Sequence, residues 1–192
     1  MRKAIIERKT KETSVFAELL LDGNGVFEAE ICEAFFKHML ELLAKNALID
    51  LKIKAIGDLQ HHIVEDIGIC LGQAFNQALA QKKGIARYGF FVLPMDESAA
   101  MTAIDFSGRN SLVFKAGFAS QCVEGFQTEL VQEFFQAFCR EARCSVFVEL
   151  LAGNNTHHSI EAIFKCFGRA LRKAIEIDDK TKQGIPSTKG IL

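Results

Sequence analysis

The residues best suited to chemistry are two pairs of adjacent histidines. One pair opens the stretch HHIVED at residues 61–66, and the other opens HHSIEA at residues 157–162. In both stretches a glutamate stands four residues after the first histidine. The chain has only five histidines, so four of them lie in these two motifs. Such a concentration at equal spacing favours a metal-binding role.

The spacing has a clear meaning if each motif lies on a helix. Residues i and i+4 share a helix face, whereas neighbours point about 100° apart. His61 and Glu65 can therefore bind one metal ion together, while His62 points away from it. The second motif repeats this geometry with its own first histidine and glutamate.

The economical arrangement uses two metal ions. Each ion takes the first histidine and the glutamate of one motif, together with the odd histidine of the other. His158 would then join the site of the first motif, and His62 would join His157 and Glu161. Imidazole and carboxylate ligands suit manganese, iron, cobalt or zinc. The alternative is that the histidines only occupy or cap exposed helix N-termini. A single copy favours that alternative, and two equivalent copies favour metal.

The elements that must position these residues follow from hydrophobic periodicity. Helical spacing of apolar residues predicts helices over four segments: 30–46, 61–82 (closed by Gly84), 128–142 and 157–176. Alternating or continuous apolar runs predict strands over five segments: 13–23, 47–58, 85–96, 99–110 and 144–154.

The order of these elements indicates an internal duplication. EAFFKHML…IKAIGD…HHIVED in the first half aligns with QEFFQAFC…ELLAGN…HHSIEA in the second. The two motifs are 157 − 61 = 96 residues apart, half the length of the chain. We therefore expect an α+β fold of two βαβα-type halves, about 1–84 and 85–176, with helices packed on one face of each sheet. The halves would form a single domain, followed by an irregular tail over 177–192.

Composition narrows the possible partners. The chain is 49% hydrophobic and 24% charged with a net charge of −1, so neither nucleic acid nor a membrane is an expected partner. A local basic face could still bind a small anion. The six cysteines form no CxxC pair, and MRKAIIERKTKETS at the start lacks the apolar core of a secretory signal. These features predict reduced cysteines and a cytoplasmic location.

Further motifs carry a resemblance to a known family. They comprise KET (11–13), LDGNG (21–25), FFKHML (35–40), GDL (57–59) before HHIVED, GIARYG (84–89), LPMDES (93–98), DFSGR (105–109), GNNTHHSIEAIFK (153–165) and PSTKG (186–190). From about Arg8 to the C-terminus, the chain resembles imidazoleglycerol-phosphate dehydratases. The resemblance implies a duplicated α/β unit, assembled from trimers into a shell of 24 subunits, with active sites between subunits. It also implies two manganese ions per site, with zinc, iron or cobalt as possible replacements.

The resemblance assigns ligands to each metal. One ion would be held by His38, His61, Glu65 and His158. The other would be held by His62, His157 and Glu161. Glu133 occupies the place of a further family histidine and could also bind a metal ion.

The resemblance also assigns residues to substrate and catalysis. A phosphate group would be bound by Arg87, Arg109, Lys165, Ser187 and Lys189, whose side chains suit an oxyanion. His38 and Glu12 would also contact the substrate. Glu12 would be the acid–base carboxylate, with Glu65 and Glu161 as further catalytic carboxylates.

The implied reaction removes water from D-erythro-imidazole-glycerol phosphate and gives imidazole-acetol phosphate, a step of L-histidine biosynthesis. Two metals on the ring nitrogens would make the ring an electron sink, and Glu12 would move the proton. The main alternative is a metal-binding, assembly-competent homologue with weak or no dehydratase activity. It is motivated by Lys37, Asn46 and Phe147, which differ from the usual family residues, and by a short loop in which only Gln60 precedes His61. A dinuclear hydrolase is a more remote alternative.

Overall fold

The computed structural model of the protein describes residues 1–178, 180, 184–190 and 192. The first half of the chain forms β1 (Lys3–Lys9), β2 (Thr13–Leu20), β3 (Phe27–Glu30), α1 (Ala34–Ala47), β4 (Asp50–Gly57) and α2 (Gln60–Leu79). The second half forms β5 (Tyr88–Met95), β6 (Ser98–Asp105), β7 (Ser111–Lys115), the short strands β8 (Cys122–Val123) and β9 (Phe126–Gln127), α3 (Leu130–Ala142), β10 (Ser145–Ala152) and α4 (Thr156–Ile175).

The two halves build equivalent sheets, which confirms the predicted duplication. Their strand orders are β1-β2-β4-β3 and β5-β6-β10-β7. In each sheet one edge pair is parallel, β3 with β4 and β7 with β10, and a helix lies between those strands in the chain. Each half is thus a βββαβα unit, to which the second half adds the separate two-stranded hairpin of β8 and β9. The predicted βαβα unit lacked β1, β3 and β7, which lie at sheet edges, and this hairpin.

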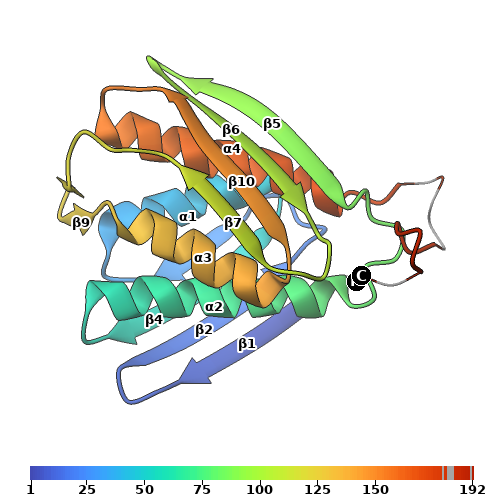
Figure 1. The fold of residues 1–192 in the computed structure, drawn as a ribbon. Coiled ribbons are helices and arrows are strands. Elements are labelled where there is room, and N and C mark those ends of the chain that lie inside the picture. The colour runs from blue at the N-terminus through green and yellow to red at the C-terminus, as the bar shows by residue number, and fades with distance from the viewer. Residues whose placement is uncertain (179, 181–183, 191) are drawn as a thin grey trace.

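The helices lie between the two sheets (Figure 1). Helix α2 packs on β1 and β2, and α4 packs on β5 and β6. The halves meet where α2 contacts α3 and where α1 contacts α4. The prediction that helices cover one face of each sheet is therefore confirmed. The buried residues form one hydrophobic core with side chains from both halves.

Phenylalanines fill the contact between the halves. The ring centroid of Phe134 on α3 lies 5.4 Å from that of Phe36 on α1 and 5.5 Å from that of Phe164 on α4. All three side chains are almost completely buried. Each such burial contributes about 1.5–3 kcal/mol, so this cluster helps to fix α4, which carries the second histidine motif, against α1 and α3.

Two equivalent glycines let each motif helix approach its sheet. Gly57 ends β4 four residues before His61, and a Cβ there would lie 2.8 Å from Ile63 Cγ1. Gly153, at φ 151°, precedes His157 by four residues, and a Cβ there would overlap Ser159 Oγ of α4 and lie 2.6 Å from Ser98 Oγ of β6. A side chain at either place would push the first helical turn away from the neighbouring strands.

The end of α2 differs from the prediction. The helix ends at Leu79 instead of continuing to a closing Gly84, because Ala80 and Lys82 both adopt positive φ, 48° and 54°. Gly84 instead binds the C-terminal tail: its amide donates to the Gly184 carbonyl at 2.9 Å. Residues 179, 181–183 and 191 of the predicted tail lie outside the described residues. Among the helices that the structure describes, none is long and apolar enough to cross a membrane.

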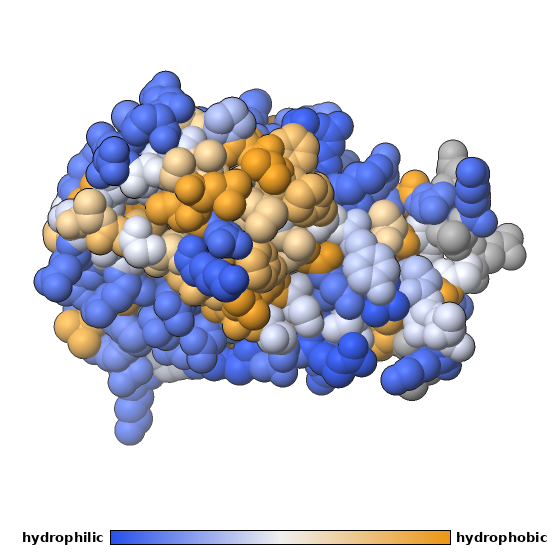
Figure 2. Space-filling model, turned by 45° about the horizontal axis from the view of Figure 1, so that its top comes forward, coloured by the Kyte–Doolittle hydropathy of each residue, from blue (hydrophilic) through white to orange (hydrophobic). Residues whose placement is uncertain are grey.

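The outer faces of the two sheets differ in character. The first sheet carries cross-strand ion pairs, with Lys52 Nζ 2.8 Å from Glu28 and Lys54 Nζ 2.5 Å from Glu30. The second sheet instead exposes apolar side chains: Tyr88, Phe90, Val92, Val113 and Leu151. Figure 2 shows apolar side chains gathered over this part of the molecule.

Candidate active site

The two histidine motifs open two helices, as their spacing predicts. Helix α2 begins at Gln60, directly before His61, and α4 begins at Thr156, directly before His157. Both helices start on the same side of the molecule, at the left of Figure 1. The first turn of α4 is capped by Asn155, whose side chain accepts a hydrogen bond from the His158 amide at 3.3 Å.

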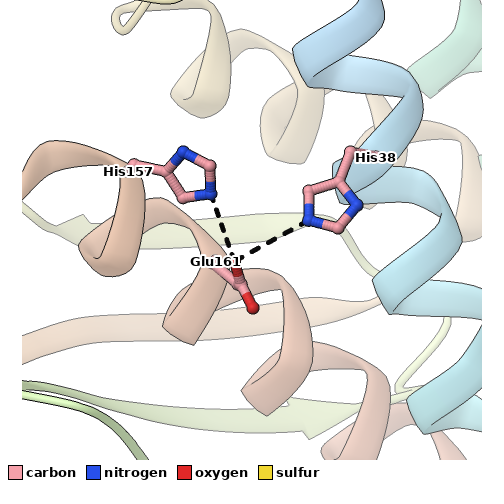
Figure 3. Close-up of side chains that lie close together, drawn as sticks. All are labelled: His38, His157 and Glu161. Atoms are coloured by element: carbon pink, nitrogen blue, oxygen red, sulfur yellow. Dashed lines mark ion pairs between the residues drawn. The ribbon is translucent and has the colours of Figure 1, made fainter.

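Three side chains converge at the start of α4 (Figure 3). One oxygen of Glu161, Oε2, lies 3.3 Å from His157 Nε2 and 3.8 Å from His38 Nε2. One potential ligand atom from each residue lies within 4.8 Å of the other two. His157 and Glu161 share a face of α4 because they are four residues apart. His38 faces them from α1, which packs against α4.

Glu161 has the protonation state that a metal ligand requires. Its side chain is only 9% exposed. Burial opposes its ionisation, but the hydrogen bond and positive charge of Lys165, 2.5 Å away, outweigh this and lower the pKa of Glu161. A buried carboxylate with two imidazole nitrogens aimed at one oxygen fits manganese, iron, cobalt or zinc.

Three of the candidate ligands are oriented by carboxylates. In each case the histidine Nδ1 lies 2.8 Å from a carboxylate oxygen, and the pairs are His62 with Asp58, His157 with Glu124, and His158 with Glu97. A carboxylate at Nδ1 stabilises the tautomer that leaves Nε2 free to bind a metal. Sequence reasoning did not identify these carboxylates. Only Asp58 has a local signal, because it precedes His62 by four residues.

These contacts also shift the titration of the groups involved. The hydrogen bond with Asp58 raises the pKa of His62, and the hydrogen bond with Glu97 raises the pKa of His158. In return, His158 lowers the pKa of Glu97 to about 2. All three carboxylate–histidine pairs are partly exposed to solvent, so their ion-pair energies are screened.

The first motif lies beside Glu12. A carboxylate oxygen of Glu12 is 3.9 Å from His62 Nδ1. His61 is exposed, and Glu65 lies 3.6 Å from Arg140 of α3. The resemblance groups His38 with His61 and Glu65, whereas within one chain His38 lies against the second motif.

Glu133, the remaining candidate ligand, lies half-buried in the first turn of α3.

The predicted phosphate-binding residues lie in different places. Arg87 donates to the Pro186 carbonyl at 2.8 Å and to Asp105 at 2.6 Å, and Asp105 raises the pKa of Arg87. In the same tail, the Lys189 amide donates to Ser187 Oγ at 3.2 Å. The structure therefore brings Arg87 next to the segment that carries Ser187 and Lys189.

The other two predicted phosphate ligands lie elsewhere. Arg109 is exposed on the loop after β6, where its amide donates to Ser107 Oγ at 3.3 Å. Lys165 lies next to the cluster of His38, His157 and Glu161, where its ammonium group forms an ion pair with Glu161.

Two groups of residues lie at opposite ends of α4: the tail group, which is Arg87 with the segment that carries Ser187 and Lys189, and the histidine cluster, which is His38, His157 and Glu161. The Arg87 amide donates to the Ala174 carbonyl in the last turn of this helix, at 2.9 Å. His157 lies in its first turn. His157 and Ala174 are 174 − 157 = 17 positions apart, which at 1.5 Å of rise per residue corresponds to about 26 Å. A small substrate cannot contact both groups of the same chain.

A comparison with protein families assigns residues 33–171 to the imidazoleglycerol-phosphate dehydratase family. The chain is 48% identical to the imidazoleglycerol-phosphate dehydratase of Pseudomonas fluorescens Pf-5, over 100% of this chain and 98% of that protein. It is 52% identical to the enzyme of Rhodopseudomonas palustris TIE-1, over 100% of this chain and 99% of the relative.

Two solved structures agree with these relationships. The chain resembles imidazoleglycerol-phosphate dehydratase from Staphylococcus aureus N315 with a TM-score of 0.85 and 38% identity, covering 92% of this chain and 99% of the other. It resembles the Pyrococcus furiosus protein in complex with (S)-C348 with a TM-score of 0.85 and 33% identity, covering 97% and 100%. The chain is therefore an enzyme of the lyase class and belongs to the imidazoleglycerol-phosphate dehydratase family.

Proposed function

We propose that the protein removes water from D-erythro-imidazole-glycerol phosphate to give imidazole-acetol phosphate, a step of L-histidine biosynthesis, and uses two manganese ions per active site. The observation that carries this proposal is the convergence of His38 and His157 on the buried carboxylate of Glu161. The names of the relatives supply the substrate class. Zinc, iron or cobalt would suit the same donor set.

The ligands proposed for the metals are the two histidine pairs with Glu65 and Glu161, and His38 and Glu133 as further candidates. When bound, the metal ions supply Lewis-acid stabilisation of the negative charge that develops on the substrate's imidazole ring. Asp58, Glu97 and Glu124 orient three of the ligand imidazoles before substrate arrives. Such preorganisation reduces the cost of reaching the reactive geometry.

Glu12 is the proposed acid–base residue. The proton to be removed lies on the carbon next to the imidazole ring. The Glu12 side chain is 59% exposed and lies beside His62, so its carboxylate can approach a substrate bound at the first motif. It would accept the proton and assist departure of the hydroxyl group.

The phosphate end of the substrate is assigned to Arg87, Arg109, Lys165, Ser187 and Lys189. Charge-assisted hydrogen bonds from such residues fix a phosphate in position and orientation. Lys165 has a second role, because its ammonium group also neutralises Glu161.

We further propose that each active site lies between subunits of a 24-subunit shell built from trimers. The distance between the tail group and the histidine cluster supports this, because a second chain must supply one of the two groups. The apolar outer face of the second sheet offers a surface for such contacts. A cytoplasmic location is supported by the six free cysteines, four of which are buried.

The decisive experiment is turnover of imidazole-glycerol phosphate by the purified protein loaded with manganese. We expect formation of imidazole-acetol phosphate, and loss of activity in His157→Ala. If the wild-type protein binds manganese and assembles but gives no product, the proposal fails in favour of the metal-binding homologue without dehydratase activity.

A further inference from the structure

We propose that the hairpin of β8 and β9 positions His157 for metal binding. Glu124 in its turn orients the imidazole, and Gln60 holds the hairpin to the start of α2. Both are positioning residues, since neither lies in the cluster that would bind the metal. This inference rests on the proposed metal-dependent function. It adds that His157 of the second motif depends on Gln60, the residue directly before the first motif.

The turn of the hairpin holds Glu124 in an uncommon backbone conformation. Two residues, Glu124 and Gly125, connect the strands, with φ of 50° and 81°. Positive φ at both positions is typical of two-residue hairpin turns, where asparagine, aspartate and glycine are favoured. Glutamate is not among these residues. Its carboxylate lies 2.8 Å from His157 Nδ1, so a functional contact accompanies the unfavourable backbone choice.

The contact determines which nitrogen of His157 faces the cluster. Because Nδ1 binds Glu124, Nε2 is the nitrogen that lies 3.3 Å from Glu161. The ring is also held by Phe35, whose centroid lies 5.2 Å away in an edge-on contact. Phe126 of the hairpin packs against Phe35 with 5.5 Å between centroids. The hairpin thus holds His157 directly through Glu124 and indirectly through Phe126.

Gln60 fixes the hairpin with its side-chain amide. Its Oε1 accepts from the Gln127 amide at 2.9 Å, and its Nε2 donates to the Gly125 carbonyl at 3.1 Å. Nε2 also lies 2.5 Å from Glu33, the residue before α1. One amide group therefore links α2, the hairpin and the start of α1, which carries His38. Loss of this group would release the turn that aims Glu124.

The test measures manganese binding to the full-length protein by calorimetry. Removing an orienting partner typically weakens metal binding about 10–100-fold, and we expect a loss in this range for Glu124→Ala. Glu124→Gln should retain more affinity, because its amide oxygen still accepts a hydrogen bond from Nδ1. The matched control is Glu129→Gln, five residues along the chain, whose side chain does not cap α3. It should bind manganese like the wild type.

A double variant tests the role of Gln60. Gln60→Ala should weaken manganese binding, but should add little in a Glu124→Ala background, since both changes act through one contact. In cobalt-loaded protein, Gln60→Ala and Glu124→Ala should change the visible absorption spectrum of the bound ion in the same way. Thermal unfolding of the metal-free variants identifies any that fail to fold, and Glu124→Gln then carries the comparison.

The outcomes separate this inference from the proposed function. If the wild-type protein binds neither manganese nor cobalt, the metal-dependent function falls. If the wild type binds manganese and both Glu124→Ala and Gln60→Ala bind it equally well, only the positioning role is wrong. Fully additive losses in the double variant would likewise overturn the link between Gln60 and Glu124.

Discussion

Arg87 and His157 lie at opposite ends of helix α4. The amide of Arg87 donates to the carbonyl of Ala174 in the last turn, whereas His157 stands in the first turn. About 26 Å of helix therefore separates Arg87, with the tail segment that carries Ser187 and Lys189, from the histidines that face Glu161 in the same chain. An active site that uses both must combine two chains.

Complementation between inactive subunits follows from this separation. Arg87→Ala and His157→Ala should each abolish most activity, because each removes one half of every site. Equal mixtures should regain about a quarter of wild-type activity. With random pairing, about one site in four combines an intact Arg87 from one chain with an intact His157 from the other. The measurement is turnover after metal-free variants are mixed and reassembled with manganese. Because Arg87→Ala also breaks the ion pair of Arg87 with Asp105, Lys189→Ala can be used in its place if Arg87→Ala is unstable.

The control mixes two variants whose changed residues belong to the same cluster, at the N-terminal end of α4. His38→Ala with His157→Ala should regain no activity, because both histidines face Glu161 within one chain. Full recovery in that mixture, or none in the first, would contradict a site divided at α4.

Metal binding should distinguish the cluster in the structure from the grouping implied by the family resemblance. His38→Ala and His157→Ala should each weaken one manganese site by at least the 10–100-fold typical of lost supporting contacts. If both histidines bind the same manganese ion, the double variant should still bind the second ion. The loss of affinity in the double variant should then be smaller than the sum of the two single losses. Elemental analysis after dialysis checks the stoichiometry. Loss of both ions in the double variant would instead place the two histidines on different metals.

Local spacing accounts for much of what could be predicted. The i,i+4 relation of His157 and Glu161 and the helix starts at both motifs depend on short-range periodicity. The duplication follows from matching segments 96 residues apart in the sequence. The missed strands β1, β3 and β7 lie at sheet edges, where few positions are buried and charged residues such as those of KAIIERK hide the pattern. The contact of Glu124 with His157 spans 33 residues, and that of His38 with Glu161 depends on packing of α1 against α4. Such tertiary contacts leave no periodic signal.

The glycines before the motifs should be intolerant of side chains. Gly57→Ala and Gly153→Ala should each lower the free energy of unfolding by about 1–3 kcal/mol, because the added methyl group overlaps packed neighbours. Each should also reduce metal affinity, since the first turn of a motif helix must move. Denaturant unfolding and calorimetry check the two effects. Gly117→Ala is the control, because a Cβ there meets nothing within 4 Å. Equal stability of all three variants would refute the packing argument.

Asp50 should make stability depend on acid. Its carboxylate accepts hydrogen bonds from the amides of Val26 at 2.9 Å and Asn24 at 2.8 Å, and these lower the pKa of Asp50 below its ordinary value of 3.8. A lowered folded-state pKa contributes stability that is present above pH 3.8 and is lost as pH falls through the folded value. Asp50→Asn should therefore unfold more easily than wild type at pH 6. The difference should shrink as pH falls below about 4, and a difference independent of pH would contradict it.

Chelation should dissociate the assembly. If metal ligands from different chains share one site, bound manganese stabilises the assembled state by mass action. We expect a large particle with manganese at neutral pH, and smaller species, such as trimers, after a chelator is added. Acid should act in the same direction, because ligand histidines must be neutral to bind metal. Light scattering with and without chelator measures the particle mass. A small mass in both conditions, or a monomer with full metal content, would overturn the shared site.

The outer sheet faces provide a separate test of the same assembly. Phe90 is 59% exposed on the apolar face of the second sheet, whereas Ile5 is 49% exposed on the charged face of the first. Because burying an unpaired charge is costly, Phe90→Glu should reduce particle mass even with manganese present. Ile5→Glu adds the same charge at similar exposure and should leave the mass unchanged. If both variants assemble like the wild type, the apolar face is not a contact between subunits.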